Sequence, residues 1–378
     1  MARLACDVAV VGGGPAGATA AMVLARAGYR VVIIEATGYD RPRVGETLPP
    51  SGRPLLAALG VWDAVVRLGP APSFANQSAW GSDEISTHPF LFDPCGSGWH
   101  IDRKRFDALL AHRAVAAGAR ILDRRRVVRC TLRPDRAWCL TLADDERRPC
   151  AEIIAPAIIE ASGRRAALAP WLGGRRRVRD RLVGVAAELR GCGDSGHTLV
   201  EAVQDGWWYS APIPGGRMMV MFMTDADLCH ARRCGDAEAW RRHLARTTHT
   251  ARRLADAEVA WGPSVISAVS HRLERVEPTG RWLAAGDAAM GVDPLSSSGI
   301  VRALTTGQAA AHAMAHWLQG RLEPVDAYER SLDAAFSAYW RERNAYYRLE
   351  QRWPDAVFWQ RRTALATAAP NAAQVATA

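Results

Sequence analysis

The first forty residues contain the pattern that most constrains the fold of this chain. A strand-like apolar run at residues 7–11 leads into the sequence GGGPAG at 12–17, and a helix-forming segment follows as far as Gly28. A second apolar run ends in Glu35, about twenty positions beyond the first glycine, which is the spacing of a carboxylate that binds a ribose hydroxyl. The pattern predicts a dinucleotide-binding βαβ unit. In such a unit the three spaced glycines permit the tight turn, the approach of a pyrophosphate and close packing of helix and strand; here they are Gly12, Gly14 and Gly17.

Composition excludes several classes of protein. The chain has 378 residues with 49% hydrophobic and 23% charged residues, as in an ordinary globular protein. No apolar run reaches the length of a membrane-spanning helix, and no signal peptide precedes the first strand, so we expect a cytoplasmic protein without a membrane partner. The eight cysteines are scattered and form no C-x-x-C pair, so neither a disulfide framework nor a metal site is expected.

The net charge of +9 comes almost entirely from arginine, and Lys104 is the only lysine. No recognised nucleic-acid-binding module accompanies this charge, so we expect no nucleic-acid partner. Short arginine clusters are usually part of a solvated surface, although they could also attract an anionic cofactor or an acidic peptide.

Three later segments also place a glycine or an acidic residue at the end of a strand or the start of a helix. Residues 153–159 form an apolar run that enters the sequence EASGR, and Gly286-Asp287 precedes a predicted helix at 300–318. Asp102 can cap another helix, and Arg103 follows it. Between them, residues 178–269 alternate as strands of a mostly antiparallel sheet.

Together these segments resemble the single-component FAD monooxygenases of the para-hydroxybenzoate hydroxylase fold, which have the flavin halogenases as close relatives. The resemblance implies non-covalent FAD, with Asp287 at the ribityl chain, Arg103 against the cofactor and residues 294–299 beside the flavin ring. The expected cofactor-binding residues are Gly12, Gly14, Pro15, Ala16, Gly17, Glu35, Ala36, Arg43, Arg103, Ser162, Gly286, Asp287, Pro294, Ser298, Gly299 and Ile300.

The resemblance also implies the domain organisation. We expect an α/β fold, α+β overall, with a Rossmann-type FAD-binding domain like that of glutathione reductase and para-hydroxybenzoate hydroxylase. This domain is discontinuous and takes residues 1–75, 101–177 and 276–325. Residues 76–100 and 178–275 form an antiparallel-sheet substrate domain, and residues 326–378 form C-terminal helices and a frayed tail.

The chain resembles two subfamilies that have different functions. Val44-Gly45-Glu46 matches the flavin halogenases, but Ser296 stands where they have glutamate, and Lys104 lies in the cofactor motif rather than in a position to guide hypohalous acid. The chain is more similar to the maturase flavoproteins that oxidise a protein-bound tryptophan during tryptophylquinone formation. The segments that carry this similarity are VGETLPPSG (44–52), SAWGS (78–82), GWHIDRKRFD (98–107), GWWYSAPIP (206–214) and residues 286–299.

This similarity implies a monooxygenase that hydroxylates the indole of a tryptophan in a peptide or partner protein through a C4a-hydroperoxyflavin. Indole chemistry needs an aromatic pocket and one proton acceptor. Glu46 is the first candidate for that acceptor, with His88 and His100 as alternatives, although each can have a purely structural role. The pocket candidates, which could equally be core residues, are Trp80, Trp207, Trp208 and Tyr209.

Several alternatives remain open at this stage. The chain could hydroxylate a free small aromatic compound or natural-product intermediate, halogenate its substrate, reduce isoprenoid chains, or bind flavin without catalysis. A second GxGxxG motif is absent from the sequence, so the electrons that reduce FAD for its reaction with O₂ must come from transiently bound NAD(P)H or from a separate flavin reductase. The sequence leaves the oligomeric state open, with a monomer as the expectation.

Overall fold

The strand that leads into the glycine motif belongs to a five-stranded parallel sheet. The computed structural model describes residues 2–193, 196–276 and 280–367. The five strands of this sheet are, in spatial order, β21 (Arg281–Ala284), β13 (Ala157–Glu160), β2 (Val8–Val11), β3 (Val31–Ile34) and β9 (Arg120–Leu122). The three central strands read AIIE, VAVV and VVII and are buried along their whole length, because helices and loops cover both faces of the sheet.

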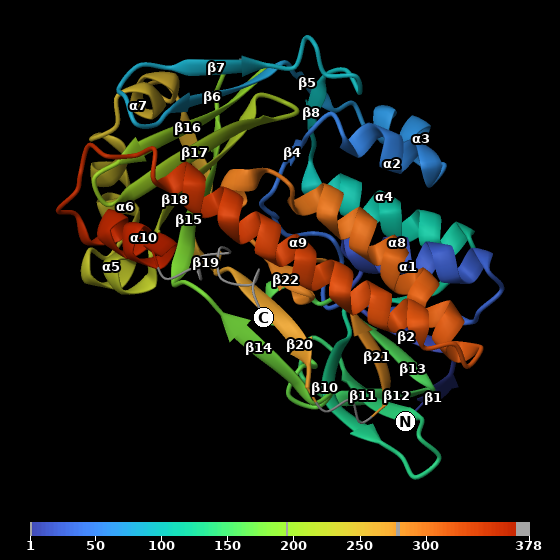
Figure 1. Ribbon diagram of the computed structural model, residues 1–378. Helices are drawn as coiled ribbons and strands as arrows, with labels where there is room; N and C mark the ends of the chain where they lie inside the picture. Colours follow the sequence, from blue (N-terminus) through green and yellow to red (C-terminus); the bar gives the residue numbers. More distant parts are fainter. Residues whose placement is uncertain (1, 194–195, 277–279, 368–378) are drawn as a thin grey trace.

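Four long helices pack together beside this sheet (Figure 1). They are α1 (Pro15–Arg26), α4 (Arg103–Ala116), α8 (Gly299–Leu318) and α9 (Glu323–Tyr347). α1 lies between α4 and α8. The approach of α8 to α1 depends on Gly307, where a Cβ atom would lie 2.4 Å from the carbonyl oxygen of Ala16. α9 is the longest helix drawn and runs from the parallel sheet toward a second, larger sheet.

The second sheet has seven strands and is antiparallel except at one pairing, β16 with β6. Strand β17 is buried at every position and strand β18 at every position after its first, because one face of the sheet packs against the C-terminal helices and the other against short helices of the same region. The strands in spatial order are β19 (Glu258–Ser267), β15 (Leu182–Arg190), β18 (Arg217–Asp225), β17 (Gly206–Ile213), β16 (His197–Val203), β6 (Ala75–Ala79) and β7 (Ser86–Pro89).

The remaining strands form three small sheets. The first contains β1 (Ala2–Ala5), β12 (Pro149–Ala155), β11 (Trp138–Ala143) and β10 (Arg126–Leu132). The second contains β14 (Gly174–Val178), β20 (His271–Arg275) and β22 (Met290–Gly291). The third contains β4 (Thr47–Leu48), β8 (Gly98–His100) and β5 (Ala71–Ser73).

The remaining helices are short. They are α2 (Gly52–Ala58), α3 (Trp62–Val66), α5 (Ala226–Ala231), α6 (Ala237–Leu244), α7 (His249–Arg253) and α10 (Val357–Thr367), with 3₁₀ turns η1 (Gly163–Arg165), η2 (Gly286–Ala288) and η3 (Pro294–Ser296). The part of the predicted frayed tail from residue 368 onward lies outside the described residues. Within the described ranges, no helix is both long enough and apolar enough to cross a membrane.

The architecture is therefore the expected α/β arrangement: a nucleotide-type parallel sheet, a largely antiparallel sheet and C-terminal helices that reach across both.

Candidate functional site

A cavity of about 780 Å³ lies between the parallel sheet and the seven-stranded sheet. At one end it is lined by the glycine turn that joins β2 to α1. At the other end it reaches strands of the larger sheet, where Tyr209, Met221 and Met223 form its wall. One continuous space thus connects a nucleotide-type cradle to an apolar chamber.

The glycine turn leaves room for a ligand at one position only. A Cβ atom on Gly12, whose φ is +105°, would lie 2.2 Å from the carbonyl oxygen of Ala161, and one on Gly17 would lie 1.9 Å from the carbonyl oxygen of Gly12. At Gly14 the nearest atom to such a Cβ is an Arg43 nitrogen at 3.8 Å. Gly14 is also the N-cap of α1 and has no side chain to occupy the helix N–H groups. This open backbone at a positive helix end suits a pyrophosphate.

Glu35 belongs to a network of charges that shapes the next part of the cavity. Its carboxylate accepts a hydrogen bond from the N–H of Gly13 at 2.8 Å and pairs with Arg43 at 2.9 Å. Arg43 also pairs with buried Asp107, at 2.9 Å, and Asp107 pairs in turn with Arg103 at 3.0 Å. Arg103 lines the cavity and donates to the carbonyl oxygen of residue 44 at 2.7 Å. The network therefore holds the loop that follows β3 against the cavity.

Asp287 lies at the start of η2 and lines the cavity with the N-terminus of α8. It pairs with Arg302 at 2.9 Å and with Arg164 at 3.3 Å. Burial alone would raise the pKa of Asp287, but the two guanidinium groups outweigh it and hold the pKa below its ordinary value. The hydroxyl of Ser298, the N-cap residue of α8, is directed to Arg302 and Ser296. A second helix N-terminus thus faces the cavity beside an ionised carboxylate.

Most of the cofactor-binding residues predicted from the sequence lie along this cavity. Three predicted residues, Gly17, Gly286 and Ser298, are not among the described residues that line it. Gly286 instead permits close packing, because a Cβ atom there would lie 2.7 Å from that of Ala16. The predicted residues that line the cavity are Gly12, Gly14, Pro15, Ala16, Glu35, Ala36, Arg43, Arg103, Ser162, Asp287, Pro294, Gly299 and Ile300.

The three candidate proton acceptors lie in different environments. Glu46 is 1% exposed, next to the cavity-lining residues Gly45 and Thr47, and its carboxyl group interacts with the hydroxyl of Tyr209. Burial raises the pKa of Glu46, and the Tyr209 hydroxyl partly opposes this. His100 is fully buried on β8, opposite Thr47 in the β4–β8 pairing. His88 lies on the exposed edge strand β7 and is not brought to the cavity.

The three candidate pocket residues on β17 are divided between its two faces, and the fourth, Trp80, follows β6. Tyr209 lines the cavity, and its hydroxyl is 2.8 Å from that of Thr47. Trp207 instead packs edge-on against Trp80, with ring centroids 6.4 Å apart, in a cluster completed by α9 and α10. Trp208 points to the opposite face of the sheet and stacks on Phe222 at 5.1 Å. Trp207 and Trp208 are thus core residues, because both faces of β17 are covered, and Trp80 is a partly buried residue packed against the same core as Trp207.

The sequence-based interpretation missed several residues of the site. Arg164 and Arg302 pair with Asp287 from segments far apart in the chain, which a single sequence does not indicate. Met221 and Met223 could have been found from the alternation of β18, MMVMFMTD, which places them on the same face as Tyr209. Trp261 on edge strand β19 also lines the cavity. In sum, the open turn at Gly14, two helix N-termini and two carboxylates suit FAD.

Comparisons with known proteins agree with this geometry. The family model described as FAD binding domain matches residues 5–341. LodB of Marinomonas mediterranea, a candidate FAD-dependent oxidoreductase, is 29% identical over 95% of this chain and 97% of its own length. The structure of the myxobacterial chondrochloren halogenase CndH matches with a TM-score of 0.82 and 26% identity, over 95% of this chain and 86% of the other. The peptidyl tryptophan dihydroxylase QhpG, essential for tryptophylquinone cofactor biogenesis, matches with a TM-score of 0.67 and 26% identity, over 94% and 78%.

Proposed function

From the premise that this chain belongs to the FAD binding domain family and is an FAD-dependent oxidoreductase, we propose that it hydroxylates a tryptophan side chain of a peptide or partner protein. The likeness to QhpG supports this choice, because that protein is a peptidyl tryptophan dihydroxylase. The observation that carries the proposal is the chamber at the far end of the cavity, whose wall of Tyr209, Met221 and Trp261 offers an indole an apolar and aromatic environment.

When bound and reduced, FAD supplies the activation of O₂ that an electron-rich aromatic ring requires. The chain's own residues bind the ring, exclude water and move one proton. The chamber wall excludes water through the side chains of β17 and β18. Tyr209 contacts both the chamber and Glu46, so its hydroxyl can pass the proton released from the hydroxylated ring carbon to the Glu46 carboxylate. Since burial raises the pKa of Glu46, its carboxylate is a stronger base than an exposed one.

Halogenation is the second candidate, because halogenases such as CndH are among the similar proteins. Two observations favour hydroxylation. Lys104, the only lysine of the chain, lies on α4 and is not among the described residues that line the cavity. Ser296, which does line it, has no carboxylate to offer at the position where halogenases have glutamate. A hydroxylase of free small aromatics remains the alternative within the same chemistry.

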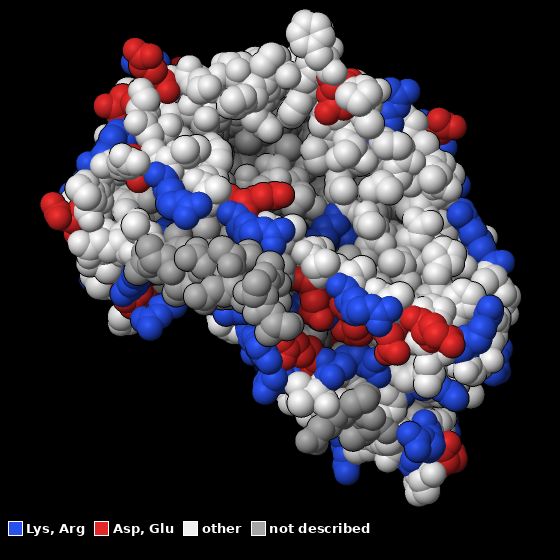
Figure 2. All heavy atoms as spheres, viewed as in Figure 1, with Lys and Arg blue, Asp and Glu red and all other residues white. Residues whose placement is uncertain are grey.

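On the face that Figure 2 shows, the described residues form no large patch of one charge that would attract the substrate to the cavity. On the face drawn in Figure 2, basic and acidic side chains are interspersed, and a hollow in the upper half is bordered mainly by uncharged atoms. A tryptophan presented by a polypeptide would use contacts beyond the reacting ring, and this remote binding energy would help position it.

The test is the oxygen-dependent mass change of a tryptophan-containing peptide. The holoenzyme, supplied with NAD(P)H and a flavin reductase, should add about 16 or 32 Da to the peptide and little to free tryptophan, with the same peptide carrying phenylalanine as the control. Turnover in bromide should give no brominated product. A brominated tryptophan would establish the halogenase, and equal turnover of free tryptophan or a phenol would refute a polypeptide substrate.

A further inference from the structure

Three side chains of α9 converge on one residue of the cavity wall. Tyr339, Arg343 and Tyr347 are spaced by four and therefore lie on one face of the helix. All three contact Asp293, the residue that precedes η3 and begins the loop at residues 293–299. We propose that these three residues form a clamp that positions the 293–299 loop, and with it the N-terminus of α8, on the wall of the cavity that would hold FAD.

The three members of the clamp hold two atoms of Asp293, its backbone nitrogen and Oδ2. The N–H of Asp293 donates to the hydroxyl of Tyr339 at 2.8 Å. The hydroxyl of Tyr347 donates to Oδ2 of Asp293 at 2.7 Å, and Nε of Arg343 lies 3.4 Å from the same oxygen. The other carboxylate oxygen, Oδ1, accepts from the N–H of Leu295 at 3.0 Å. The backbone and side chain of Asp293, which is 1% exposed, are thus both fixed.

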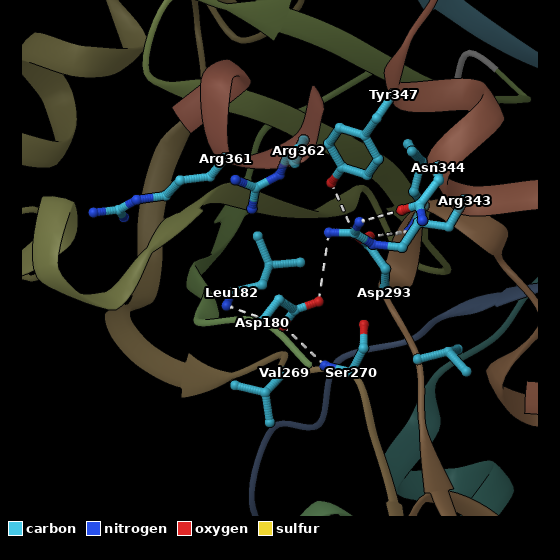
Figure 3. A network of polar contacts seen from close by, with 12 residues as sticks. Asp180, Leu182, Val269, Ser270, Asp293, Arg343, Asn344, Tyr347, Arg361 and Arg362 are labelled. Atoms are coloured by element: carbon cyan, nitrogen blue, oxygen red, sulfur yellow. Dashed lines mark hydrogen bonds and ion pairs between the residues drawn. The ribbon is translucent and has the colours of Figure 1, made fainter. Parts of the chain in front are cut away.

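Arg343 balances two buried carboxylates (Figure 3). Its second partner, Asp180, lies 3.4 Å away and accepts from the N–H groups of Ser270 at 3.0 Å and Leu182 at 3.3 Å. The guanidinium also lies over the ring of Tyr347, 4.4 Å from its centroid. Removing this cation would leave two buried carboxylates without compensation, so Arg343 is too severe a site for a first test.

The clamp also connects the loop to the strand that forms the chamber. The indole N–H of Trp207 donates to the hydroxyl of Tyr347 at 2.9 Å. Trp207 lies on β17 two positions before Tyr209, whose side chain lines the cavity. One tyrosine hydroxyl therefore bridges the chamber strand and the loop that lines the cavity beside the N-terminus of α8.

The loop needs an external support because its own backbone is strained. Ser297 has φ +47°, in the left-handed region that disfavours residues other than glycine. Pro294, Ser296, Ser297 and Gly299 all line the cavity, so a displacement of the loop changes its shape directly. The proposal needs only FAD binding and does not depend on which substrate is oxidised.

The experiment compares Tyr347→Phe with Tyr346→Phe on the same helix. Both remove one tyrosine hydroxyl from the same aromatic cluster, but that of Tyr346 interacts with Ser78 of β6 rather than with the loop. Tyr347→Phe should weaken FAD binding about 5- to 20-fold, less than the about 10- to 150-fold of a hydrogen bond to a charged group, because the lost bond lies within the protein and only part of it is transmitted to the cofactor. It should also shift the visible absorption bands of bound FAD. Its midpoint potential should become more negative, because a displaced helix N-terminus stabilises the reduced, anionic flavin less.

Tyr346→Phe should leave the FAD dissociation constant, spectrum and potential at their wild-type values. Tyr339→Phe should shift all three in the same sense as Tyr347→Phe, and the two changes should be non-additive because both act on Asp293. Thermal unfolding of each apoprotein separates local from global effects. The clamp is wrong if Tyr347→Phe binds FAD with wild-type affinity, spectrum and potential, or if Tyr346→Phe alters them equally.

Discussion

Replacing Gly14 with alanine tests the cofactor cradle without disturbing the fold. The backbone there has φ −70° and ψ −175°, which alanine adopts readily, and a Cβ atom would contact only Arg43, at 3.8 Å. Alanine makes the unfolded chain less flexible, which raises the free energy of unfolding, but it is a poorer N-cap residue than glycine, which lowers it. We therefore expect the free energy of unfolding of the apoprotein to change by no more than about 0.5 kcal/mol.

FAD binding should respond much more strongly. The added methyl group would keep a pyrophosphate from the N–H groups at the start of α1, lengthening hydrogen bonds to a charged group that are each worth about 1.5–3 kcal/mol. A loss of about 2 kcal/mol raises the dissociation constant about 30-fold. Gly17→Ala is the contrasting variant, because its Cβ would lie 1.9 Å from the carbonyl oxygen of Gly12 and should destabilise the apoprotein itself.

The assay is titration of apoprotein with FAD, followed by flavin fluorescence, together with urea unfolding of each apoprotein. Wild-type FAD affinity in Gly14→Ala would show that no pyrophosphate approaches this turn. A large loss of apoprotein stability in the same variant would refute the view that the space beside Gly14 is open.

Three further predictions concern the chamber and the strand that forms its wall. Burial raises the pKa of Glu46 above its ordinary 4.5, so the native state retains a proton that the unfolded chain releases, and stability falls as pH rises from about 4.5 toward the raised pKa. Glu46→Gln should remove this part of the pH dependence in urea unfolding, and an unchanged profile would show that Glu46 is ionised in the native state throughout. Trp208→Ala should cost about 3–5 kcal/mol of stability without changing FAD affinity, since Trp208 is fully buried on the face away from the cavity. Tyr209→Phe should keep stability within about 1 kcal/mol but slow turnover at least about tenfold; equal turnover would exclude its hydroxyl from proton transfer.

The sequence predicted the glycine turn between β2 and α1 well because backbone geometry there depends on residue type. Only glycine fits at Gly12 and Gly17, so the spacing of the motif carries the geometry with it. The same holds for Asp102, whose side chain caps α4 as expected. The resemblance proposes a role for Asp287 at the cofactor, but the partners of Asp287, Arg164 and Arg302, depend on contacts that form only in three dimensions.

The chamber was harder to predict for a different reason. Residues 206–213 are buried at every position, so hydrophobicity does not indicate which face of β17 meets the cavity. Alternation separates Trp208 from Tyr209, but Trp207 lies on the same face as Tyr209 and is covered there by aromatic rings of α9 and α10 rather than facing the cavity. His88 is exposed because β7 is an edge strand, a position that follows from the order of the sheet rather than from local sequence.

The strand order of the parallel sheet determines when the sheet is completed during synthesis and which fragments of the chain can form it. β2 needs β13 as a neighbour, and β13 needs β21, which is not made until residue 284 has left the ribosome. Until then the nascent chain exposes a strand edge whose sequence, AIIE, suits pairing with other chains. Fragments that end before residue 281 should therefore aggregate rather than bind flavin, and FAD can load only onto a chain that has completed both halves of its cradle.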